Sequence, residues 1–127
     1  MRIITYPSEA GLQGAVVSIG MFDGVHRGHR RVLRQLREQG RERRLPTVVI
    51  TFDPHPRAVL RPDARPVLLS SLEDRMGLLA MTGSVDYCLV LPFDRQRSGE
   101  SADDFVQHTL VVGLGMHALV VGENFAC

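Results

Sequence analysis

Four short apolar runs constrain the fold of this chain more strongly than any other feature of its sequence. They lie at residues 15–19, 47–52, 86–91 and 117–121, and each is followed by a glycine, an aspartate or a proline. Valine, isoleucine and leucine fill successive positions, so both faces of each run are largely apolar. Such strands are typical of parallel sheets that are buried on both faces. We therefore expect these runs to form the core of a parallel sheet.

The segments between the runs carry the apolar spacing of amphipathic helices. The predicted helices run from Gly28 to Gly40, from Ser70 or Ser71 to Gly83, and onward from Ser101, with serine caps and glycine stops at these ends. Strands that alternate with helices predict an α/β fold with helices on both faces of the sheet. The N-terminal stretch, residues 2–6, is predicted as an additional edge strand.

Polar and small residues follow every predicted core strand, at positions 20–23, 52–55, 92–94 and 122–125. The carboxyl ends of parallel strands meet at one edge of a sheet. In open α/β sheets, ligands bind at that edge, near the point where the strand order reverses. The sequence therefore predicts a ligand site built from these four loops.

The stretch GMFDGVHRGH at residues 20–29 joins the first core strand to the first helix. A helix that begins near Gly28 places His26 just before its first turn and His29 within it. The mouth of a helix offers unpaired backbone N–H groups and a positive dipole end, and imidazoles add donors for phosphate oxygens. Gly24 and Gly28 leave the backbone open to close approach. These features predict a polyphosphate-binding site.

The spacing of this stretch excludes two common nucleotide-binding motifs. Its glycines do not form the dinucleotide fingerprint G-x-G-x-x-G, and the chain contains no P-loop of the form G-x-x-x-x-G-K-[ST]. A zinc site of His26, His29 and His55 is conceivable, although no cysteine pair or H-E-x-x-H supports it. A pair of capping histidines with no ligand is the remaining alternative to phosphate binding.

Charge and hydropathy argue against two kinds of partner. The formal net charge is +1, so the chain has no global basic field that would attract nucleic acid. Arginines nonetheless gather between residues 27 and 44, and we interpret them as the solvated face of the first helix. No apolar run approaches the length of about 18 residues that a membrane helix needs, so we expect a cytoplasmic protein. We interpret Cys88 as a small buried apolar side chain.

Three motifs resemble signatures of the FMN adenylyltransferase (FAD synthetase) module of bacterial bifunctional riboflavin kinase/FAD synthetases, in the nucleotidylyltransferase superfamily. GMFDGVHRGH at 20–29 resembles the first signature, TFDPHP at 51–56 the second and VGENF at 121–125 the third, in the same order. The resemblance extends from Val16 to the end of the chain. Met21 departs from it, since the family commonly carries asparagine there, which would weaken a polar contact near the nucleotide.

The resemblance implies a Rossmann-like open parallel sheet that binds ATP with Mg²⁺ and transfers AMP to the phosphate of FMN, so that FAD forms and pyrophosphate leaves. It implies that His26 and His29 are the catalytic residues and contact the triphosphate. It places Asn124 near the Mg²⁺ ion or the phosphates. The residues implied or expected to bind the nucleotides are Gly20, Phe22, Asp23, Gly24, Gly28, Asp53, His55 and Asn124.

The family's module continues past the third motif to a further signature, whose arginine binds phosphate, and then to a riboflavin kinase domain. We therefore expect residues 1–127 to be the N-terminal part of a FAD synthetase domain, without the riboflavin kinase domain. A sheet left incomplete at its C-terminus would expose an edge and favour self-association. Two alternatives remain: a truncated nucleotide-binding module with little or no catalysis, and another nucleotidylyltransferase of the H-x-G-H type, acting on a cytidylyl group or on phosphopantetheine.

Overall fold

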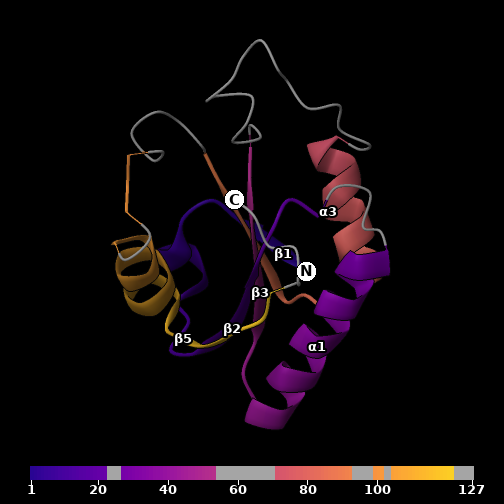
Figure 1. Ribbon diagram of the computed structural model, residues 1–127, viewed down its shortest axis with the longest axis horizontal. Helices are drawn as coiled ribbons and strands as arrows, with labels where there is room; N and C mark the ends of the chain where they lie inside the picture. The colour runs from indigo at the N-terminus through magenta and orange to yellow at the C-terminus, as the bar shows by residue number, and fades with distance from the viewer. Residues whose placement is uncertain (23–26, 54–70, 93–98, 102–103, 122–127) are drawn as a thin grey trace.

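A computed structural model describes residues 1–22, 27–53, 71–92, 99–101 and 104–121. Within them the chain forms a five-stranded parallel sheet with the strand order β1-β4-β3-β2-β5 (Figure 1). The strands are β1 (Arg2–Ile4), β2 (Ala15–Ile19), β3 (Thr47–Phe52), β4 (Tyr87–Leu91) and β5 (Met116–Leu119). All four predicted strands are present, and the N-terminal stretch forms an edge strand beside β4, as predicted. The prediction of burial on both faces was wrong for β5, because this strand lies at the other edge of the sheet, where His117 and Leu119 are exposed.

Helices cover both faces of this sheet. The helices α1 (Arg27–Arg43) and α3 (Leu72–Met81) lie together on one face, and the 3₁₀ helix η1 (Pro7–Ala10) and the π-helix η4 (Phe105–Gly113) lie on the other (Figure 1). Neighbouring residues of β2 point to opposite faces, so Val16 packs in the cluster under α1 and Val17 in the cluster under η4. Each face buries its own apolar cluster, which confirms the Rossmann-like open parallel sheet.

The strand order reverses at β2. From β2 the chain proceeds to β3 and β4 on one side, and β5 then pairs with the opposite side of β2. The carboxyl end of β2 therefore lies at the switch point, where open α/β sheets bind their ligands. The helix that follows β2 is α1, so the fold brings the start of α1 to the edge at which the sequence predicts the site.

The first helix is longer than the sequence predicts. α1 continues through Gly40 to Arg43, and Arg44 follows it with a φ of 57°. Gly40 is buried, and a Cβ atom there would stand 2.7 Å from Cγ2 of Thr47. The glycine is thus needed for the close approach of α1 to β3, and the prediction that it stops the helix was wrong.

The other two predicted serine caps accept hydrogen bonds near their helices, although η4 itself begins only at Phe105, four residues after Ser101. Ser71, and not Ser70, is the N-cap of α3, and its Oγ accepts a hydrogen bond from the backbone N–H of Asp74 at 3.1 Å. The Oγ of Ser101 accepts in the same way from the N–H of Asp104, also at 3.1 Å. The helix after Ser101 is of the π type, a feature that its apolar spacing does not reveal.

Candidate functional site

A strained turn leads the chain off the end of β2. The N–H of Gly20 donates to the carbonyl of Ile50 in β3 at 3.0 Å, and Phe22 then takes a φ of 54° in the left-handed region. The Phe22 ring is only 2% exposed, and a Cβ atom on Gly20 would stand 3.0 Å from it. Gly20 therefore allows the ring to fold back against the strand end. A non-glycine residue with such a φ value is strained, and it persists only where the surrounding structure compensates for the strain. Such residues cluster at active sites and ligand-binding turns.

His29 lies in the first helical turn of α1, and its ring contacts the ring of Phe22 in the strained turn after β2. Its imidazole is partly buried, and its ring centroid is 5.0 Å from that of Phe22, with an interplanar angle of 49°. Gly28, one residue earlier, is exposed. The structure thus brings the imidazole of His29, the buried ring of Phe22 and the N-terminal end of α1 together at the switch point. A helix N-terminus with an adjacent imidazole donor is chemically suited to oxygen anions.

Asp53 occupies the neighbouring position on the same edge of the sheet. It follows β3 directly, its N–H donates to the carbonyl of Leu91 at 3.1 Å, and the residue is exposed. Since β3 pairs with β2, the carboxylate of Asp53 is held one strand away from the turn at Gly20. Carboxylate oxygens at such an edge suit a hard cation or a sugar hydroxyl.

Half of the residues predicted for the site lie outside the described residues. They are Asp23, Gly24, His26, His55 and Asn124. The pairing of His26 with His29, and the alternative zinc site of His26, His29 and His55, therefore stay predictions. Within the described part of the chain, no group of three histidine, cysteine, aspartate or glutamate residues is arranged to hold a metal ion.

Sequence reasoning missed one residue beside this edge, Arg75 of α3. Its side chain is 1% exposed, and its Nη1 donates to the carbonyl of Met21 at 2.9 Å and to Oγ1 of Thr51 at 3.1 Å. The signal was available, because positions 72, 75, 76 and 79 recur at helical spacing and so place Arg75 on the buried face of α3. The guanidinium links α3, the end of β3 and the turn after β2.

Two other buried side chains, Ser18 and Cys88, lie on the same face of the sheet as Arg75. The hydroxyl of Ser18 is fully buried on the same face of the sheet, and within the described residues neither its Oγ nor the Nε of Arg75 has a hydrogen-bond partner. Burial raises the pKa of the Cys88 thiol to about 12, and the positive charge of Arg75 opposes that rise. Cys88 is fully buried, which confirms the prediction of a small apolar side chain there.

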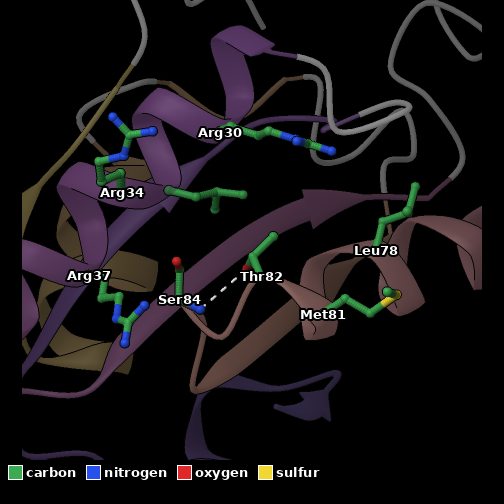
Figure 2. Close-up of a pocket in the computed structure, with 8 residues that line it drawn as sticks. Arg30, Arg34, Arg37, Leu78, Met81, Thr82 and Ser84 are labelled. Atoms are coloured by element: carbon green, nitrogen blue, oxygen red, sulfur yellow. Dashed lines mark hydrogen bonds between the residues drawn. The ribbon is translucent and has the colours of Figure 1, made fainter.

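A cavity of about 420 Å³ lies apart from this site, between α1 and α3 (Figure 2). Its lining residues are Arg30, Leu33, Arg34, Arg37, Leu78, Met81, Thr82 and Ser84. The three arginines are exposed, and Figure 2 shows their guanidinium groups pointing in different directions instead of converging on one centre. This exposure confirms the predicted solvated face of the first helix at these positions. None of the described site residues lines the cavity.

One known protein family matches almost the whole chain. Residues 8–127 match the family described as FAD synthetase. The chain belongs to the FAD synthetase family. The match covers the strained turn, the start of α1 and the buried Arg75, so every described element of the site lies within the region that this family shares.

The curated relatives are bifunctional bacterial enzymes. The bifunctional riboflavin kinase/FMN adenylyltransferase of Escherichia coli (strain K12) is 42% identical over 118 residues, which are 93% of this chain and 37% of that protein. The protein of the same name from Pseudomonas fluorescens is 41% identical over 113 residues, which are 89% of this chain and 36% of that protein. The chain therefore spans little more than a third of the length of these relatives.

A solved structure supports the fold. A crystal structure described as a macrolide-efflux protein from Streptococcus pneumoniae superposes with a TM-score of 0.79 at 28% identity, covering 94% of this chain and 46% of that one. Within the part of this chain that the structure describes, no helix has the length and apolar character to cross a membrane.

Proposed function

We propose that this FAD synthetase family chain carries an FMN adenylyltransferase site, which transfers AMP from ATP to FMN. An oxygen of the FMN phosphate attacks the α-phosphorus of ATP, the bond from that phosphorus to the bridging oxygen breaks, and pyrophosphate leaves as FAD forms. The observation that carries the proposal is the position of His29. Its imidazole lies at the N-terminal end of α1 and at the strand switch point, held against a buried aromatic ring.

Such a reaction needs positioning and charge stabilisation more than covalent catalysis. Negative charge grows on the oxygens around the transferred phosphorus, and fixed N–H donors that point there lower the barrier. We assign that role to the imidazole of His29 and to the first N–H groups of α1. His26 is assigned the same role by the resemblance of its motif, and this assignment stays a prediction.

The remaining predicted residues would shape the nucleotide pocket. Gly20 and Phe22 would form its floor at the strained turn, and Gly28 lies exposed in the first turn of α1. Mg²⁺ commonly enters such sites on substrate phosphates and needs only one or two protein oxygens, so the exposed carboxylate of Asp53 fits it. When bound with ATP, the ion neutralises part of the triphosphate charge. We retain Asp23, Gly24, His55 and Asn124 as predicted ligands of the nucleotides, with Asn124 near Mg²⁺.

The test is the formation of FAD by the purified protein. The protein is incubated with FMN, ATP and Mg²⁺, and the products are separated by chromatography, with parallel reactions in which CTP replaces ATP or phosphopantetheine replaces FMN. We expect FAD and pyrophosphate in equal amounts only with FMN and ATP. Product in either substituted reaction instead would assign the chain to the other nucleotidylyltransferases, and the absence of product and of ATP binding would refute a nucleotide site.

A matched pair of variants tests the role of His29. His29→Gln removes the imidazole from the switch point, and we expect the rate of FAD formation to fall by about 100-fold. His108→Gln removes an exposed imidazole from η4, on the opposite face of the sheet, and should leave the rate unchanged. Equal rates for the two variants would remove His29 from the mechanism.

A further inference from the structure

Arg75 is a fully buried cation whose described acceptors are two neutral oxygens. One acceptor is the carbonyl of Met21 and the other is the hydroxyl of Thr51, and its side chain is 1% exposed. Within the described residues, no carboxylate lies within ion-pair distance of its guanidinium. Burying a charge without a counter-ion costs several kcal/mol, so proteins retain such an arrangement where the charge has a use.

The location of Arg75 indicates that use. The carbonyl that it holds belongs to Met21, the residue immediately before the strained Phe22. Thr51, its second acceptor, is the penultimate residue of β3, two positions before Asp53. Thr51 Oγ1 and the Met21 carbonyl lie 3.5 Å apart, so one guanidinium fixes the ends of two adjacent strands relative to each other.

Met21 connects this contact to the candidate phosphate site. Its carbonyl orientation is coupled to the φ of Phe22, and the Phe22 ring lies against the imidazole of His29 at a centroid distance of 5.0 Å. A change at Arg75 would therefore be transmitted over three contacts to His29. The charge of Arg75 also acts directly on the candidate phosphate site, because a buried charge is screened much less than an exposed one.

We propose that Arg75 is a positioning residue for the triphosphate of ATP. It holds the turn after β2, residues 20–22, through the Met21 carbonyl. Its charge, which no carboxylate among the described residues offsets, makes the carboxyl edge of the sheet attractive to a polyphosphate anion. Arg75 does not touch the nucleotide in this scheme, since its side chain is only 1% exposed. The inference rests on the nucleotide site proposed above and extends it to a residue of α3 that lies outside the three motifs.

The test separates charge from structure with ligands of different charge. Binding of inorganic triphosphate and of uncharged adenosine is measured by calorimetry for the wild-type protein and for two substitutions. Arg75→Gln keeps an N–H donor for the Met21 carbonyl but removes the charge. Arg75→Lys keeps the charge. We expect Arg75→Gln to bind triphosphate about tenfold more weakly, and Arg75→Lys to stay within about threefold of the wild type. Adenosine affinity should be the same for all three proteins.

Two results would overturn the proposal. One is a folded Arg75→Gln protein that binds triphosphate as tightly as the wild type, and the other is an equal loss for adenosine and triphosphate, which a merely structural role would produce. Folding of each variant is checked by circular dichroism and thermal unfolding. If Arg75→Gln does not fold, Arg75→Met takes its place, because an apolar side chain of similar length suits the buried position. A wild-type protein that binds neither triphosphate nor ATP would instead refute the nucleotide site itself.

Discussion

The contact between Phe22 and His29 can be tested by removing the ring while keeping an apolar side chain. Phe22→Leu leaves the buried position filled, and leucine must adopt the same φ of 54°, so the backbone strain is unchanged. A volume-conserving core substitution costs less than about 1.5 kcal/mol, and the lost ring contact costs about 0.5–1.5 kcal/mol more. Since the Phe22 side chain is 2% exposed, we expect both effects in full, a loss of about 0.5–3 kcal/mol in the free energy of unfolding.

The consequence for function is larger than the consequence for stability. Without the ring, the His29 imidazole loses the contact that fixes its orientation at the mouth of α1. A misplacement of about 1 Å in a phosphoryl-transfer site lowers the rate by up to about 100-fold, and we expect FAD formation to fall by at least about tenfold. The ring-current contribution to the His29 Cε1–H shift should also disappear from the NMR spectrum, whether or not the protein turns over.

The matched control is Ile4→Val. Ile4 is 1% exposed in the edge strand β1, and its side chain packs in the cluster on the opposite face of the sheet. This substitution should cost about 0.5–1.5 kcal/mol and leave both the His29 signal and the rate unchanged. The reasoning fails if Phe22→Leu loses the expected stability but keeps the wild-type His29 shift and rate.

Three further predictions concern the packing that supports the site. Ser71→Ala removes the N-cap of α3 and should lower the free energy of unfolding by about 1 kcal/mol in a urea titration. Gly40→Ala forces a Cβ against Thr47 and should destabilise by about 1–2 kcal/mol in spite of the better helix former, whereas Gly77→Ala, with open space around it, should stabilise by up to about 1 kcal/mol. The raised pKa of Cys88, about 12 against an ordinary value of 9.0, makes the folded state bind the thiol proton more tightly than the unfolded state. Stability should therefore be fully present below about pH 9 and fall by up to about 1.4 kcal/mol per pH unit above it, under reducing conditions, and this slope should be absent from Cys88→Ala.

The strands and their parallel arrangement were predictable because each run is apolar at consecutive positions. Only burial on both faces explains such a pattern, and the structure buries all five residues of β2 and all six of β3. Strand order at the edges is a weaker signal in sequence. The three residues of β1 are predictable as a strand, but they do not show which strand they pair with, since their pairing with β4 depends on the rest of the sheet.

Gly40 shows where local rules stop being sufficient. A glycine after a helical pattern predicts a helix end, because isolated helices lose stability there. In the folded chain the same glycine lies inside α1, where Thr47 of β3 leaves no room for a Cβ atom. The choice between a helix stop and a close approach depends on tertiary packing, which one helix's sequence does not contain.

Arg75 shows the converse, a functional candidate hidden by a rule that is usually right. Charged residues on helices are usually solvated, and those of α1 at Arg30, Arg34 and Arg37 are. Helical spacing alone places Arg75 among Leu72, Met76 and Leu79, so its charge conflicts with its position. Such a conflict between residue type and expected burial is typical of functional sites, where a residue lowers the stability of the fold but serves binding or catalysis. The same test applied to the first helix finds no conflict, because the exposed arginines of α1 alternate with Leu33 and Leu36 as an amphipathic helix requires. We therefore connect the buried Arg75, and not the more numerous exposed arginines of α1, to the chemistry of the sheet edge.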